Sequence, residues 1–267
     1  MMDRIGVMQG RFTPKGGFLP QQFPWENWKD EFYLAGVNNV PFIEWMFNDE
    51  QHENNPVWTH EGRLEIKEIV ANTGVKVSSI CMNYYMENGI FRYGKKSLDI
   101  LARIAMAAQE LDATVLVIPL FGESNVHEEE HMRKLMTEFA CVVAGSDIKL
   151  AFETNWNAEA IKRCIESIDN DKVGVCYDVG NLCGEGHDVI AELHSLHSIV
   201  KEVHIKDKKM VDGDSVMLGH GSVPFWEVFR LMVDMPVRFV LESYFGNDAI
   251  KDTLCNINYI RRVMDEQ

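Results

Sequence analysis

Three acidic residues and one histidine each stand at the end of a short apolar segment with the pattern of a buried strand. They are Glu153, Asp178, His204 and Glu242. The clearest of these segments is 173–177, Val-Gly-Val-Cys-Tyr, after which Gly180-Asn181 is expected to turn the chain away. An acid at the end of a buried strand is costly unless its charge is used there. Three carboxylates and an imidazole suit a divalent cation of hard to intermediate character, so we predict that the four residues bind one metal ion.

A simpler interpretation applies to each acid taken alone. A carboxylate at a strand end can cap a following helix or pair with a nearby cation. Four such groups on consecutive strands are hard to explain by capping alone. Three acids packed together without a cation would also repel one another and raise one another's pKa. The pattern as a set therefore favours a metal site.

Eight strand-like segments alternate with amphipathic helical segments along the chain. Strands are predicted at 5–8, 40–45, 75–81, 114–119, 148–153, 173–178, 199–205 and 237–242. Helices are predicted at 28–35, 54–73, 97–111, 125–144, 157–168, 188–196, 224–233 and 250–263, with long loops after the first and seventh strands. This alternation indicates parallel strands joined by right-handed crossovers.

Eight such units in a chain of 267 residues indicate an α/β protein with a closed (β/α)₈ TIM barrel, a single domain over residues 1–267. The alternative is an open doubly wound sheet, but no GxGxxG motif follows the first strand. Barrel enzymes place their chemistry at the carboxyl ends of the strands, where the four candidate ligands stand.

Composition excludes several classes of function. The formal net charge of −15 argues against a nucleic acid partner, which needs a basic face. The six cysteines form no metal-binding spacing, so free thiols in a reducing compartment are expected. No apolar run approaches the roughly 18 residues that span a membrane, and no signal peptide is evident, so we predict a cytoplasmic protein without a membrane partner. The number of subunits is not set by the sequence, and a homo-oligomer stays open.

Five strand-end motifs resemble one known superfamily. They are Ala151-Phe-Glu153-Thr-Asn155, Tyr177-Asp178-Val-Gly-Asn181, His204-Ile-Lys206-Asp207-Lys208, Gly219-His-Gly221 and Leu241-Glu242-Ser243. The chain is similar over essentially its whole length to the xylose-isomerase-like TIM-barrel superfamily, and within it to the sugar phosphate isomerase/epimerase group that includes the ketose 3-epimerases. The opening Val7-Met-Gln-Gly-Arg11 resembles a subset of that group.

The resemblance implies a function for the four ligands. Glu153, Asp178, His204 and Glu242 would bind one divalent ion, commonly Mn²⁺, with Mg²⁺, Co²⁺ and Zn²⁺ as alternatives. The substrate would be a small sugar or sugar phosphate, a ketose that chelates the ion through its carbonyl and adjacent hydroxyl and passes through a cis-enediolate. Glu153 would remove the proton beside the carbonyl, and Glu242 would return one from the opposite face. The resemblance therefore implies a metal-dependent isomerase or epimerase acting on carbohydrates.

The sequence departs from the three-zinc AP endonuclease branch of the superfamily. Asn181 stands where that branch and the ketose 3-epimerases carry histidine, and strands three and four end in Cys81-Met-Asn83 and Pro119-Leu120 without the expected histidines. Together with the acidic charge, this makes a DNA repair function improbable.

Four further residues are candidates for substrate binding. Asn181 and Lys206 lie beside proposed ligands, Arg11 follows the first strand, and Glu44 lies near the end of the second. The guanidinium of Arg11 suits an anion, and Glu44 could bind a sugar hydroxyl, although a structural ion pair is the alternative for both. Asp207 is more readily explained as a tie for its own loop.

Two other functions fit the same residues. One is a metal-dependent dehydratase of a keto-cyclitol, of the inosose type, in which enolisation of the substrate is followed by loss of a β-hydroxyl. A non-catalytic sugar-binding barrel would bind without turnover, but it would have no need of a base on each face of the substrate.

Overall fold

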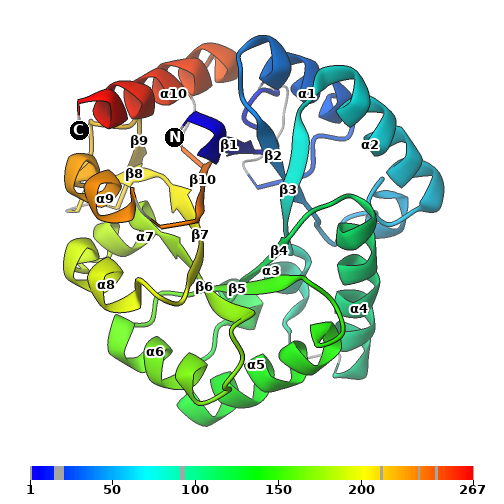
Figure 1. Cartoon of the computed structure of the whole chain (residues 1–267), viewed down its shortest axis with the longest axis vertical. Coiled ribbons are helices and arrows are strands. Elements are labelled where there is room, and N and C mark those ends of the chain that lie inside the picture. Colours follow the sequence, from blue (N-terminus) through cyan, green and yellow to red (C-terminus); the bar gives the residue numbers. More distant parts are fainter. Residues whose placement is uncertain are drawn as a thin grey trace.

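The structure is a computed structural model that describes residues 2–14, 21–90, 94–210, 213–233, 235–243 and 246–266. Eight parallel strands close into a barrel in the order β1-β10-β7-β6-β5-β4-β3-β2, with helices around the outside (Figure 1). The strands are β1 (Ile5–Met8), β2 (Phe42–Met46), β3 (Lys76–Cys81), β4 (Val115–Pro119), β5 (Lys149–Glu153), β6 (Val173–Asp178), β7 (Val200–Ile205) and β10 (Arg238–Leu241). The predicted (β/α)₈ barrel is confirmed.

The helices follow the strands in turn. They are α1 (Trp28–Val37), α2 (His60–Thr73), α3 (Tyr84–Asn88), α4 (Lys95–Glu110), α5 (Glu129–Val143), α6 (Ala158–Glu166), α7 (Val179–Gly184), α8 (Val189–Leu196), α9 (Phe225–Met232) and α10 (Ala249–Asp265). Three short 3₁₀ segments lie at Met2–Arg4, His52–Asn54 and Gly122–Ser124. None of the helices in these described ranges is long and apolar enough to cross a membrane.

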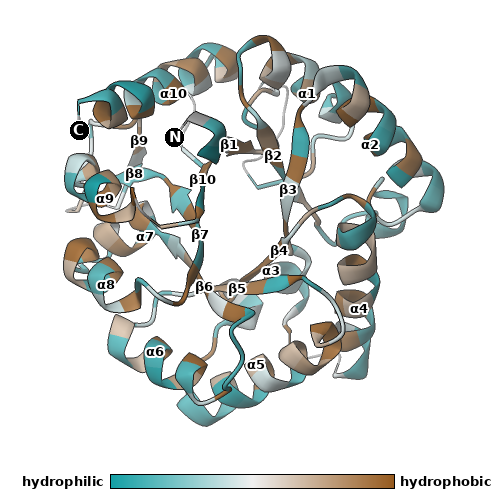
Figure 2. Ribbon diagram, in the orientation of Figure 1, coloured by the Kyte–Doolittle hydropathy of each residue, from teal (hydrophilic) through white to brown (hydrophobic). Residues whose placement is uncertain are grey.

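Apolar strands and one-sided helices build the core. Every residue of β4 is buried, as expected for a parallel strand covered on both faces. On α4 the buried residues include Leu101, Ile104 and Ala108, which recur at helical spacing on the face toward the barrel. Figure 2 shows hydrophobic residues concentrated along the strands and hydrophilic residues on outward-facing parts of the helices.

Local capping shifts some of the predicted boundaries. Helix α2 begins at His60, later than predicted, because the hydroxyl of Thr59 accepts a hydrogen bond from the backbone N–H of Gly62. It ends at Gly74, whose φ of 73° is the left-handed conformation expected at that position.

Helices α3 and α7 and a hairpin after β7 were not predicted from the sequence. The chain does not simply turn at Gly180-Asn181: it enters the short helix α7 directly after β6, because Asp178 accepts hydrogen bonds from the N–H groups of Gly180 (2.9 Å) and Asn181 (2.8 Å). The loop after β7 also contains a two-stranded antiparallel hairpin, β8 (Asp207–Lys208) and β9 (Ser215–Val216). The carboxylate of Asp207 accepts hydrogen bonds from the N–H groups of Gly219, Gly221 and Val223, so it ties down this loop as predicted.

Gly174 on β6 lies against the backbone just before β7, which gives a testable prediction. A Cβ at Gly174 would lie 2.0 Å from the carbonyl oxygen of Ile199, whereas one at Gly145 would meet nothing within 4 Å. We expect Gly174→Ala to lower the free energy of unfolding by roughly 1–3 kcal/mol through overpacking. Gly145→Ala, the matched control, should leave it unchanged or raise it by about 0.4–1 kcal/mol. Urea unfolding of both variants checks the prediction, and equal effects would contradict it.

Candidate metal centre

The carboxyl ends of four neighbouring strands bring the four candidate ligands together. Glu153 and Asp178 are the last residues of β5 and β6, His204 lies near the end of β7, and Glu242 directly follows β10. Asp178 and His204 are register partners across β6 and β7. One ligand atom from each of the four residues lies within 4.8 Å of the other three, and all four side chains are buried.

The imidazole of His204 faces two of the carboxylates. Its Nδ1 atom lies 2.9 Å from Oε2 of Glu242 and 3.7 Å from Oε2 of Glu153. Nδ1 nevertheless makes no hydrogen bond of good geometry within the described chain, although it is fully buried. A buried nitrogen without such a bond, surrounded by carboxylate oxygens, is the arrangement that a cation completes.

The spacing and chemistry of these groups fit a divalent ion. Ligand atoms held at about 2.0–2.2 Å from an ion lie at most about 4.4 Å apart, which is close to the spacing within this set. The donor set of carboxylate oxygens and one imidazole nitrogen suits Mn²⁺, Mg²⁺, Co²⁺ or Zn²⁺ and gives no preference for a soft metal.

Asp178 has two functions, one for each carboxylate oxygen. Its Oδ1 caps α7, so the capping interpretation is correct for this half of the group. Its Oδ2 faces the site and accepts hydrogen bonds from Nζ of Lys206 (2.9 Å) and from Nδ2 of Asn181 (2.6 Å). Nζ of Lys206 also lies 2.9 Å from Oε1 of Glu242. Lys206 therefore bridges two of the candidate ligands.

These contacts shift the pKa values of Glu153 and Glu242, the two candidate proton-transfer groups, in opposite directions. Burial, with Glu242 and Asp178 nearby, raises the pKa of Glu153 to about 8. Burial alone would also raise the pKa of Glu242, but Lys206, His204 and Arg11 hold it well below its usual value. Burial would lower the pKa of Lys206, but the attraction of Asp178, Glu242 and Glu153 raises it instead. In the metal-free protein at neutral pH, Glu153 is thus largely protonated and Glu242 ionised.

A cavity of about 180 Å³ opens onto this site. Its lining includes Glu153, Glu242, Asn181 and Lys206. The remaining lining residues are Met8, Gln21, Cys81, Asn83, Met86, Pro119 and Phe121. A ligand here would meet carboxylates, amides and one ammonium together with several apolar groups, which suits a small polar molecule.

Arg11 and Glu44, two of the predicted substrate-binding residues, do not line this cavity. Nη2 of Arg11 lies 3.8 Å from Oε1 of Glu242 and donates a hydrogen bond to its backbone oxygen at 3.5 Å. Glu44 is fully buried and contacts the far edge of the His204 ring. Both are held inside the protein by charged partners, so the geometry favours the ion-pair alternative. Asn181 and Lys206, in contrast, are exposed to the cavity.

The described part of the segment between β1 and α1 supplies a residue at the site that the sequence did not indicate. Gln21, with a left-handed φ of 73°, donates a side-chain hydrogen bond to Oε1 of Glu242. Its backbone oxygen accepts from Nδ2 of Asn48 (2.8 Å) and of Asn83 (3.3 Å). The unusual length of this loop was the only feature of the sequence that drew attention to it. Residues 15–20 of the loop lie outside the described residues.

The start of the same segment is anchored by a buried acid on α1. The carboxylate of Glu31 accepts hydrogen bonds from the N–H groups of Gly10 (2.9 Å) and Phe12 (3.0 Å) and from the hydroxyl of Thr13 (2.8 Å). Burial raises the pKa of Glu31 to about 7 despite these bonds. Glu31 thus fixes the backbone next to Arg11.

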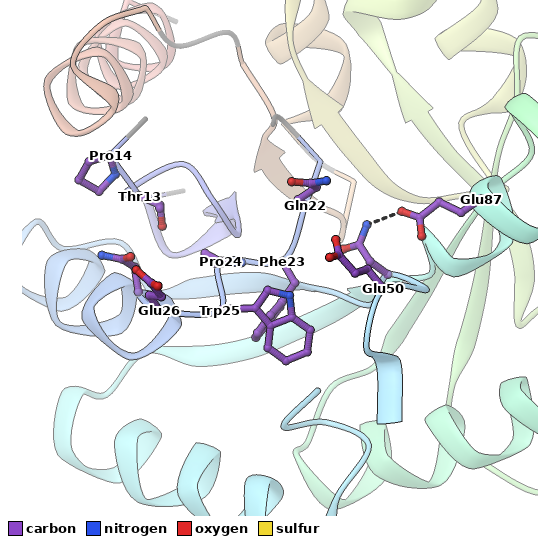
Figure 3. Close-up of a pocket in the computed structure, with 11 residues that line it drawn as sticks. Thr13, Pro14, Gln22, Phe23, Pro24, Trp25, Glu26, Glu50 and Glu87 are labelled. Atoms are coloured by element: carbon purple, nitrogen blue, oxygen red, sulfur yellow. Dashed lines mark hydrogen bonds between the residues drawn. The ribbon is translucent and has the colours of Figure 1, made fainter. Parts of the chain in front are cut away.

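A larger cavity of about 350 Å³ lies on the outer side of this segment (Figure 3). Glu50 and Glu87 stand on one side of it and Thr13 and Pro14 on the other. It shares no lining residue with the cavity at the four ligands. Although this cavity is larger, it does not contain the four converging ligands, so we do not assign it as the candidate site.

Comparison with known proteins places the chain in a family. The family described as "Xylose isomerase-like TIM barrel" matches residues 37–260, which is most of the chain. The chain belongs to this family. The resemblance inferred from the strand-end motifs is confirmed at this level, and the matched region contains all four candidate ligands.

Similar proteins include two named sugar 3-epimerases and a protein solved with a zinc atom. The L-ribulose-5-phosphate 3-epimerase UlaE of Shigella boydii is 27% identical over 228 residues, which cover 78% of each protein. D-psicose 3-epimerase of Clostridium cellulolyticum, solved with D-tagatose, shares the fold with a TM-score of 0.75 at 11% identity over 98% of this chain and 99% of that one. The IolI protein, solved with a zinc atom, has a TM-score of 0.76 at 13% identity over 98% of both chains.

Proposed function

We propose that the protein is a metal-dependent isomerase or epimerase of a ketose or ketose phosphate. The observation that carries this proposal is the convergence of Glu153, Asp178, His204 and Glu242 on one point at the carboxyl end of the barrel. Membership of a family with sugar epimerases, including one for a ketose phosphate, supports the substrate class. Manganese as the native ion and a cytoplasmic location stay predictions.

The two glutamates have the positions and proton affinities for acid–base work. A divalent ion bound by the four ligands would polarise the ketose carbonyl and stabilise charge on its oxygen. Glu153 and Glu242 both line the cavity that a sugar would enter. One would take the proton from the carbon beside the carbonyl, and the other would return a proton to the opposite face of the resulting enediolate. Removal and return on opposite faces invert the carbon centre.

Lys206 and the amides would orient the sugar. The ammonium of Lys206 and the amides of Gln21, Asn83 and Asn181 line the same cavity and are donors for hydroxyl or carbonyl oxygens. Lys206 is already held by Asp178 and Glu242, and its charge also stabilises the ionised form of Glu242. We expect these groups to act mainly on substrate orientation.

Solvent deuterium exchange tests the proposed function. With Mn²⁺ bound, the protein should wash deuterium from D₂O into the carbon beside the carbonyl of at least one member of a panel of pentuloses, hexuloses and their phosphates. Inversion without loss of water would identify the epimerase, and exchange followed by water loss would identify the keto-cyclitol dehydratase instead. Saturable sugar binding without exchange would contradict catalysis and favour the non-catalytic barrel. NMR of the reaction mixture distinguishes these results, with heat-denatured protein as the control.

A further inference from the structure

His204 has an acidic neighbour on the edge of its ring that is opposite Nδ1. Its Nε2 atom lies 3.1 Å from Oε1 of Glu44 on β2, which is ion-pair distance, although the angle departs from that of a good hydrogen bond. The other oxygen of Glu44, Oε2, accepts a hydrogen bond of 2.9 Å from the hydroxyl of Ser79. Glu44 and Ser79 are register partners on β2 and β3. Glu44 is thus held from one side and faces the imidazole with the other.

This contact cannot be explained by substrate binding. Glu44, Ser79 and His204 have no exposed surface, and Glu44 does not line the cavity at the four ligands. A carboxylate moved from water into the barrel interior is costly unless it has a charged or hydrogen-bonding partner. The partner that the structure provides for Oε1 is the ring of a candidate metal ligand. Glu202 also lies within 4.8 Å of both groups, so the pair is enclosed by protein.

The chemistry of imidazole connects this contact to the metal centre. A neutral imidazole carries one proton, on Nδ1 or on Nε2. Nδ1 faces Glu242 and Glu153 and can bind a cation only when the proton is on Nε2. A carboxylate next to Nε2 favours that tautomer, restricts rotation of the ring and makes Nδ1 a better ligand.

We propose that Glu44 is a positioning residue that keeps the proton of His204 on Nε2 and thereby directs Nδ1 to the divalent cation. The inference rests on the proposed function, because it concerns the same centre. This role for Glu44 takes the place of the earlier prediction that Glu44 binds a sugar hydroxyl. A purely structural role for Glu44 would affect folding stability but not the affinity for the ion.

The test is the affinity of Glu44→Gln for Mn²⁺, measured by EPR titration of free Mn²⁺. Glutamine keeps the shape of the side chain and can still accept from Ser79, but it has no charge for the imidazole. We expect the Kd to rise about 10–100-fold, as for other groups that support a metal-bound histidine. Glu192→Gln is the matched control, because Oε1 of Glu192 lies 2.9 Å from Nδ1 of His187 at a glutamate–histidine contact outside the metal centre. It should bind Mn²⁺ like the wild type.

Two further variants keep the inference testable if Glu44→Gln folds poorly, and a spectroscopic measurement adds a second readout. Ser79→Ala removes the group that holds Glu44 and should raise the Kd by a smaller factor, while Glu44→Asp should bind Mn²⁺ more tightly than Glu44→Gln. Electron spin-echo envelope modulation should detect the ¹⁴N of His204 on Mn²⁺ in the wild type and a weaker signal in Glu44→Gln. Wild-type affinity and modulation in a folded Glu44→Gln variant would overturn the inference. Tight Mn²⁺ binding by a wild type that shows no sugar turnover would instead overturn only the proposed function.

Discussion

Replacing Glu242 by glutamine is expected to lower the rate of carbon-bound hydrogen exchange by about 10³-fold, within the range for loss of a general acid–base group. The effect should be large because Glu242 combines several interactions. One of its oxygens contacts Lys206 and Gln21, and the other lies 2.9 Å from Nδ1 of His204. Its pKa is held well below the usual value, so its carboxylate is ionised in the metal-free protein. Glutamine keeps the shape but cannot accept a proton.

The companion variant Glu153→Gln should show a loss of the same order, because epimerisation needs a proton-transfer group on each face. The two variants differ in a way that rate measurements can detect. If Glu153 and Glu242 act on opposite faces, each variant should retain exchange with only one of the two epimeric substrates, at a reduced rate. Glu26→Gln, which removes a carboxylate from the outer cavity, is the control and should keep the wild-type rate. Near-wild-type exchange by a metal-loaded Glu153→Gln or Glu242→Gln variant would rule out the proposed proton transfer.

The barrel and the meeting of the four ligands were predictable because both depend on local patterns. Runs such as Val115–Pro119 are apolar on both faces and too short for helices, and their alternation with amphipathic segments determines the parallel topology. In a parallel barrel all carboxyl ends lie at one mouth. The convergence of residues at the ends of successive strands can therefore be predicted without any knowledge of side-chain contacts.

Helix α7 was missed because its sequence has weak helix signals. Val179, Gly180 and Asn181 have low intrinsic helix propensity, so a turn was the better expectation. The helix forms because Asp178 caps it and because Gly180 leaves room for the next strand's loop. A Cβ at Gly180 would lie 2.6 Å from the backbone oxygen of Lys206. Tertiary packing, which the local sequence does not report, overrides propensity here.

The partners of the ligands were not predictable for a similar reason. Glu44 and His204 are on β2 and β7, which are not neighbours in the barrel order, and they meet only because the sheet closes. The bridge from Lys206 to both Asp178 and Glu242 depends on the direction of a long flexible side chain. Motif resemblance indicated the four candidate ligands but not the residues that hydrogen-bond to them and balance their charge.

Removal of divalent cations by a chelator is expected to lower the exchange rate by at least about 10³-fold, and addition of Mn²⁺ should restore it. Without the ion the carbonyl is not polarised, a contribution of several kcal/mol to the barrier. Three buried carboxylates would also be balanced mainly by Lys206, with Arg11 beside Glu242. Binding should therefore stabilise the fold, by about 2.7 kcal/mol when Mn²⁺ is at 100 times its Kd. Calorimetric scans of the metal-free and Mn²⁺-loaded protein measure this as a rise in Tm.

The pH dependence of Mn²⁺ affinity separates specific binding at this centre from binding to surface acids. The pKa of Glu153 is raised to about 8 in the metal-free protein, so below that pH the carboxyl carries a proton that the ion must displace. The pKa of His204 is also raised above its usual value, so its Nδ1 must lose a proton as well. Affinity should therefore rise by at least about tenfold per pH unit between pH 6 and pH 8, with at least one proton released per ion. Exposed carboxylates are already ionised at pH 6 and would give no such slope. Activity that survives complete removal of the ion, or an affinity independent of pH, would show that the four residues do not act as this metal centre.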